Sequence, residues 1–62
     1  MSESILNGKT ILAVDDEPDV LSVLKEEILG AAPKCKFEKA VTYEEATKKL
    51  ESQTYDVVIL DI

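Results

Sequence analysis

The hydrophobic positions of the chain fall into five segments whose spacing alternates between that of a strand and that of a helix. Nearly unbroken apolar runs at 9–14 and 55–62 predict strands that are covered on both faces. Apolar residues recur with a helical period at 18–29 and at 43–52, and a shorter alternating stretch at 35–40 predicts another strand. The predicted order is strand, helix, strand, helix, strand, which indicates an α/β fold with parallel strands.

Residues with strong local preferences mark the boundaries of the predicted helices. Pro18 suits the first helical position because its missing N–H would have no partner there. Gly30 predicts a left-handed cap at the end of the same helix. Thr42 and Glu45 have the spacing of a capping box, which predicts the start of the second helix.

Several other side chains are expected to be structural. Cys35 should be a small buried hydrophobe on the same strand face as Phe37, and the lysines of that strand suit an edge position. Tyr43 and Tyr55 are expected to pack against the core, the former together with the apolar face of its helix. Asp56 is expected to be a turn or edge acid.

The length of 62 residues allows one small unit. Residues 1–8 are expected to form a mobile leader that ends in the turn formers Asn7 and Gly8, and residues 9–62 to form a single domain. A chain of this size buries only roughly 60% of the surface that its unfolded state exposes. Because there is one cysteine and no histidine, no disulfide or zinc cluster can compensate, and we expect marginal stability.

The charge balance excludes some classes of partner. Seven lysines and no arginine oppose thirteen acidic residues, for a net charge of −6. Nucleic acids and anionic membranes are therefore not expected as partners. No apolar run approaches the roughly 20 residues that span a bilayer, and the first residues lack the features of a signal peptide. A lone cysteine without such a signal favours a reduced, cytoplasmic protein.

Carboxylates follow both of the long apolar runs. Asp15 and Asp16 follow the first run and Asp61 ends the last one. If these strands are parallel neighbours, the acids meet at the sheet edge where open α/β sheets bind ligands. Adjacent carboxylates repel one another unless a cation compensates them, and Mg²⁺ combines one or two carboxylates with waters and phosphate oxygens. The three acids therefore predict a Mg²⁺ site, with Asp61 as a nucleophile that accepts a phosphoryl group.

A purely structural interpretation of these acids is also open. Asp16 could cap the first helix while Asp15 remains a solvated loop acid, and Glu17 is expected to be a solvated acid at the helix start. The presence of Asp61 on the neighbouring strand favours the metal interpretation.

Three stretches of the sequence together resemble the receiver domain of two-component response regulators. They are ILAVDDEPDV at 11–20, AVTYEEA at 40–46 and YDVVILDI at 55–62. The resemblance implies the amino-terminal half of a flavodoxin-like fold, with a βαβαβ parallel sheet of strand order 2-1-3. It also implies that Asp61 accepts phosphate from a sensor histidine kinase. Asp16 would ligate Mg²⁺ directly, and Asp15 would hold it largely through water.

The family also supplies groups from later sequence that these 62 residues do not contain. They are a main-chain carbonyl ligand two residues after the phosphoacceptor, a Ser or Thr, a Lys and a switching aromatic. We therefore expect a truncated receiver domain with impaired phosphotransfer and no enzymatic turnover of its own. The family order would also leave the Val57–Ile62 strand as a bare hydrophobic edge, which predicts self-association through that edge.

Two other classes of function agree with parts of the sequence. The chain could be a self-assembling half-fold scaffold without activity, in which the acids are vestiges. A phosphohydrolase of the haloacid-dehalogenase type also uses strand-end aspartates, but it needs two acids spaced two residues apart on its first strand. Asp15 and Asp16 are adjacent and run directly into Glu17, which does not fit that pattern.

Overall fold

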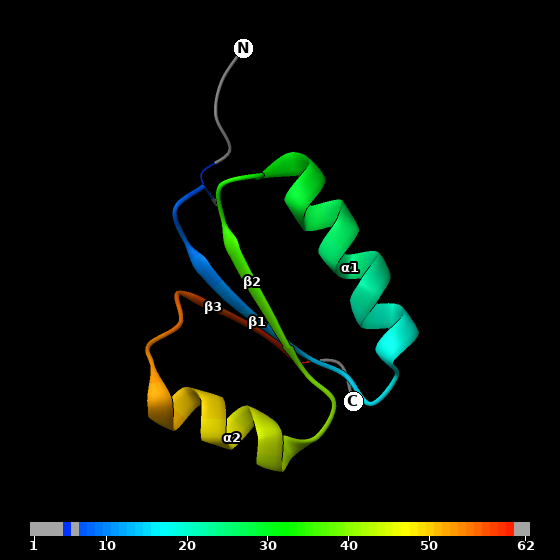
Figure 1. The fold of residues 1–62 in the computed structure, drawn as a ribbon, viewed down its shortest axis with the longest axis vertical. Helices are drawn as coiled ribbons and strands as arrows, with labels where there is room; N and C mark the ends of the chain where they lie inside the picture. Colours follow the sequence, from blue (N-terminus) through cyan, green and yellow to red (C-terminus); the bar gives the residue numbers. More distant parts are fainter. Residues whose placement is uncertain (1–4, 6, 61–62) are drawn as a thin grey trace.

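The computed structural model describes residue 5 and residues 7–60. These residues form a three-stranded parallel sheet with two helices (Figure 1). The order of elements predicted from the sequence and the strand order 2-1-3 are both confirmed. The elements are β1 (Thr10–Val14), α1 (Pro18–Ala31), β2 (Lys36–Ala40), α2 (Tyr43–Ser52) and β3 (Val57–Leu60).

The central strand β1 explains why its sequence is almost purely apolar. It pairs with β2 on one side and with β3 on the other, and α1 and α2 lie on opposite faces of the sheet (Figure 1). Ile11 packs with Ala32 and Cys35 on the α1 face, while Leu12 and Val14 pack on the α2 face. All five of these residues are buried, and the burial predicted for Cys35 is confirmed.

The start of α2 follows the predicted capping box. The backbone N–H of Glu45 donates to Oγ1 of Thr42 over 3.1 Å, which satisfies one of the free donors of the first turn. The carboxylate of Glu45 accepts in return from the backbone N–H of Val41 over 2.8 Å, one residue before the cap.

The end of α1 differs from the prediction, because Gly30 is not a left-handed cap. The helix continues through it to Ala31, and the N–H of Ala32 donates to the carbonyl of Ile28 over 2.7 Å. The alanines after Gly30 favour continued helix, and Pro33 then disfavours helical geometry at Ala32. Gly8 is the described residue with positive φ, at 84°, in the turn that precedes β1.

Both helices cover the sheet incompletely. Ala46 is the buried residue of α2, whereas Tyr43 is 61% exposed, so the predicted packing of Tyr43 is wrong. The helix α2 packs on β1 and β2 through Ala46, and Tyr43, its first residue, lies outside the buried cluster of that face. On α1 the buried residue is Leu21, and Val20 remains 38% exposed.

Candidate functional site

The carboxyl ends of the three strands lie level with one another. Val14 of β1 is paired with Ala40 of β2 and with Leu60 of β3. Whatever follows these residues emerges at the same edge of the sheet. This is the edge at which parallel α/β sheets bind ligands.

Asp15 leaves β1 at this edge and is the buried charged side chain of the described residues, with 5% of its surface exposed. Its backbone N–H donates to the carbonyl of Ala40 over 3.1 Å, which fixes it against the end of β2. Its Oδ1 accepts from the backbone N–H of Glu17 over 2.8 Å. A buried carboxylate is unfavourable unless hydrogen bonds or a positive charge compensate it. Within the described residues Asp15 has this hydrogen bond and no ion pair.

These contacts exchange the roles that the structural interpretation gave to Asp15 and Asp16. Asp15 is the acid that is buried and bonded at the helix start, while Asp16 is exposed. The residue at the N-cap position is Glu17, whose exposed side chain makes no capping hydrogen bond. The exposure predicted for Glu17 is confirmed. Asp16 is therefore left at the sheet edge without a capping role.

Asp61, the predicted phosphoacceptor, lies outside the described residues. The described chain reaches Leu60, which is paired with the residue that precedes Asp15. Among residue 5 and residues 7–60, no group of three acidic, cysteine or histidine side chains could hold a metal ion. Carboxylate oxygens are the donors that Mg²⁺ prefers, so Asp15 and Asp16 fit that ion in chemical type. The predicted trio with Asp61 stays a prediction.

Asp56 lies at the opposite end of β3 and has the structural role predicted for it. Its Oδ2 accepts from the backbone N–H of Thr10 over 2.9 Å, and its own N–H donates to the Thr10 carbonyl over 2.9 Å. These two bonds fasten the start of β3 to the start of β1.

A second polar cluster, which we term the Glu38 network, was not predicted. Glu38 of β2 accepts from the Tyr55 hydroxyl over 2.8 Å, from Nε2 of Gln53 over 2.7 Å and from Nζ of Lys49 over 3.3 Å. The same Gln53 nitrogen also lies 2.8 Å from the Tyr55 hydroxyl. The network connects β2 with the end of α2 and with the segment that leads into β3. Because its members come from separate elements, no local sequence pattern could indicate it.

The hydrogen bonds of this network change the acidity of two groups. Donation by Tyr55, and then by Gln53, holds the pKa of Glu38 below its ordinary value of 4.5. Desolvation raises the pKa of Tyr55 above its ordinary value of 10.0, and the bond to Glu38 raises it further. The network thus favours a charged Glu38 and a neutral Tyr55. Its contacts are those of a structural link between elements.

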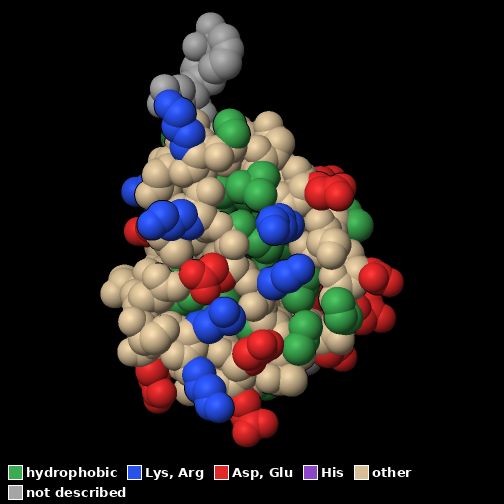
Figure 2. All heavy atoms as spheres, in the orientation of Figure 1, with side chains coloured by type: hydrophobic (Ala, Val, Ile, Leu, Met, Phe, Trp, Pro, Cys, Tyr) green, Lys and Arg blue, Asp and Glu red, His purple; other side chains and the backbone are tan. Residues whose placement is uncertain are grey.

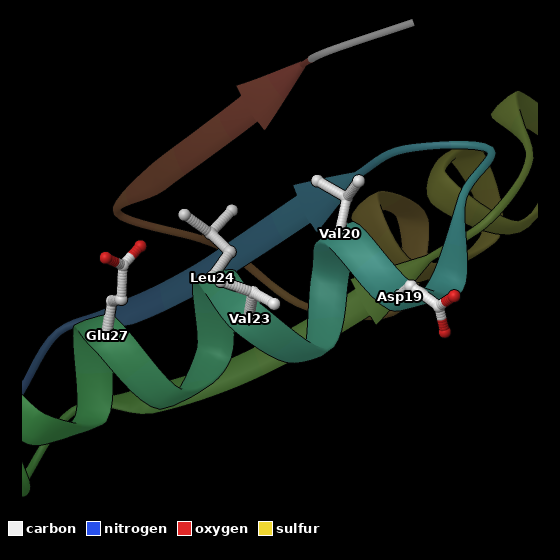
Figure 3. Close-up of a pocket in the computed structure, with 5 residues that line it drawn as sticks. All are labelled: Asp19, Val20, Val23, Leu24 and Glu27. Carbon is white, nitrogen blue, oxygen red and sulfur yellow. The ribbon is translucent and has the colours of Figure 1, made fainter.

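A shallow groove of about 330 Å³ lies along α1 (Figure 3). Its walls come entirely from that helix, and Val20 and Leu24 project from the same side in the close-up. Sequence periodicity places these residues in the apolar face of the helix but cannot show how much of that face the sheet covers. The lining residues are Asp19, Val20, Val23, Leu24 and Glu27.

Comparison with protein families, with curated proteins and with solved structures found no match for this chain. Within the described residues, no helix has the length and apolar character needed to cross a membrane.

Proposed function

We propose that this chain is a phosphoacceptor domain of the response-regulator receiver type, built as the amino-terminal half of a flavodoxin-like fold. The observation that carries the proposal is the buried Asp15 at the carboxyl end of β1, beside the paired residues Val14 and Leu60. A parallel sheet of order 2-1-3 supports it, because this order makes β1 and β3 neighbours. The sequence that follows Leu60 supplies Asp61.

In the proposed reaction, a carboxylate oxygen of Asp61 attacks the phosphorus of a phosphohistidine on a sensor histidine kinase. A P–O bond forms, the P–N bond breaks and the electron pair returns to the imidazole, which leaves an aspartyl phosphate. Mg²⁺ bound by Asp15, Asp16 and Asp61 would neutralise charge on the phosphoryl oxygens. The hydrogen bond that Asp15 accepts from the Glu17 N–H, and the bond that its own N–H donates to the Ala40 carbonyl, would hold this carboxylate in position.

The experiment is incubation with acetyl phosphate and Mg²⁺, followed by intact mass spectrometry. We expect a gain of one phosphoryl group that requires Mg²⁺, with a low yield because the Ser or Thr and Lys donors of the family lie in later sequence. Asp61→Asn should abolish the gain. Asp56→Asn is the matched control just before β3 and should retain the gain, because Asp56 accepts a hydrogen bond from Thr10 at the other end of the sheet.

The competing function is a scaffold that assembles without phosphorylation. It is favoured by the apolar β3 edge, where Leu60 is 60% exposed. The same mass measurement separates the two functions. Equal masses for the untreated chain and the treated chain, with intact folding by circular dichroism, would favour the scaffold over the phosphoacceptor.

A further inference from the structure

The helix α1 begins beside a weak cap although a better cap precedes it. Glu17 takes the N-cap position, and its side chain makes no capping hydrogen bond. Asp16 lies one residue earlier and is exposed. Aspartate is among the preferred N-cap residues because its short carboxylate reaches the free N–H groups of the first turn, whereas glutamate is not among them. On capping preference alone, α1 would therefore begin at Glu17, with Asp16 as its cap.

Pro18 explains why the helix begins one residue later. It is the first residue of α1. A residue that precedes proline is disfavoured in helical geometry, because its backbone clashes with the proline ring. Glu17 is accordingly extended, with a φ of −111° and a ψ of 107°. Because Pro18 keeps Glu17 out of the helix, it also keeps Asp16 out of the cap position.

The extended Glu17 connects the buried acid of the site with the helix. Its backbone N–H donates to Oδ1 of Asp15 over 2.8 Å. Its carbonyl accepts from the N–H groups of Val20 and Leu21 over 3.1 Å and 3.3 Å. The first turn is thus anchored through the backbone of Glu17, and this arrangement makes no use of the Asp16 carboxylate.

The electrostatics of the helix start do not depend on Asp16 either. The N-terminus of a helix carries a partial positive charge, and Asp19 in the first turn complements it. Figure 2 shows further acidic side chains along the side of the molecule where α1 lies. Asp16 therefore remains exposed beside the buried Asp15, at the edge of the sheet where the cation is expected.

We propose that Pro18 is a positioning residue of the cation site: by holding Glu17 in an extended conformation, it keeps the carboxylate of Asp16 out of the cap of α1 and available to Mg²⁺. This inference rests on the proposed function, because it assigns Asp16 to the cation site of the phosphoacceptor. The side chain of Pro18 offers no ligand atom. Pro18 acts through the residue at which the helix begins.

The first experiment is Pro18→Ala, which restores a backbone N–H and permits helical geometry at Glu17. Pro18 is exposed, so the substitution leaves the core unchanged. The Cα chemical shift of Glu17, measured by NMR without metal, should move to a helical value. The dissociation constant for Mn²⁺ should rise about fivefold, which is the size of a typical cap interaction. Electron paramagnetic resonance of the unbound ion measures this constant.

Two further variants separate this role from a general loosening of the loop. Pro33→Ala makes the same change at an exposed residue beyond the other end of α1 and should leave Mn²⁺ affinity unchanged. Glu17→Ser in the Pro18→Ala background should restore the affinity, because serine is a preferred cap and returns the start of the helix to Pro18→Ala itself. A loss of affinity that came from loop flexibility would not be rescued in this way.

The outcomes distinguish a failure of this inference from a failure of the proposed function. If the original chain binds Mn²⁺ and Pro18→Ala binds it equally well, the role of Pro18 is overturned and the cation site stands. A loss that Glu17→Ser does not rescue, or a Glu17 that stays extended in Pro18→Ala, would overturn the role as well. Absence of Mn²⁺ binding by the original chain would contradict the proposed function, and the role of Pro18 with it.

Discussion

The two outer strands of the sheet, β2 and β3, both pair with β1 in the parallel direction, but they differ in charge and in burial. The strand β2 carries alternating charges, is approached by both helices and ends in the buried Ala40. The strand β3 is uncharged, and its residues alternate between half-buried and exposed. The two edges of the described sheet therefore lie in different environments, although both outer strands pair with β1 in the same way.

This difference separates the part of the molecule that stabilises the fold from the part that carries the proposed chemistry. The capping box at Thr42 and the Glu38 network both lie on the β2 side. The acids of the candidate site lie at the end of β1, next to β3. Substitutions on the β2 side should mainly change stability, and substitutions at the acids of the candidate site should mainly change the proposed chemistry.

The largest effect on stability is expected at Leu12, a core residue of the central strand β1. Leu12→Ala should lower the free energy of unfolding by about 2–5 kcal/mol, because Leu12 is fully buried under α2. Val58, its neighbour in the β1–β3 register, is 41% exposed, and Val58→Ala should change stability by less than about 1 kcal/mol. Urea denaturation followed by circular dichroism measures both changes. Comparable losses would show that β3 is as well covered as β1.

A smaller effect is expected at the cap of α2. Thr42→Ala removes the acceptor for the N–H of Glu45 and should lower the free energy of unfolding by about 1 kcal/mol. Thr54→Ala makes the same chemical change at an exposed position between α2 and β3 and should have an effect within about 0.5 kcal/mol. The same denaturation experiment compares them. If Thr54→Ala had the larger effect, stability would not be concentrated on the β2 side.

The smallest effect is a dependence on pH that originates in the Glu38 network. Since the pKa of Glu38 is lowered in the folded state, its contribution to stability is present above its ordinary value of 4.5 and disappears as the pH falls through the lowered pKa. Glu38→Gln should therefore be less stable than the original chain at pH 7, with a difference that shrinks below pH 4.5. Thermal melts over this range measure the difference.

At high pH the same network makes stability depend on pH in the opposite direction. The raised pKa of Tyr55 means that its contribution is present below 10.0 and disappears as the pH rises through the raised value. Tyr55→Phe should show no such decline at high pH. If the difference in melting temperature between the original chain and Glu38→Gln were the same at every pH, the network would not connect β2 to α2 through a charged carboxylate.

The elements of the fold could be predicted because each has a local cause. The apolar run of β1 reflects burial on both faces, and the spacing of Thr42 and Glu45 is sufficient to start α2. The prediction for Gly30 failed because the alanines that follow it, and the proline beyond them, determine where the helix ends. Local spacing also could not predict that Tyr43 stays exposed although it shares a predicted helix face with the buried Ala46.

The candidate site could be predicted only in part. The sequence places acids after β1, and the level strand ends confirm that β1 and β3 finish at one edge. It could not indicate which acid is buried, because the burial of Asp15 depends on its bonds to Ala40 and Glu17. The Glu38 network needs the folded arrangement of three segments, so sequence spacing contains no sign of it.

The most direct test of the proposed cation site is a titration with Mn²⁺, in place of Mg²⁺, monitored by the broadening of backbone amide signals in NMR spectra. We expect broadening first at Asp15 and Leu60 and little at Asp56, which lies roughly 13 Å from Leu60 at about 3.3 Å per strand residue. Asp15→Asn should weaken the effect. Broadening that begins at Asp56, or that is uniform over the acidic surface, would contradict a shared cation site at the ends of β1 and β3.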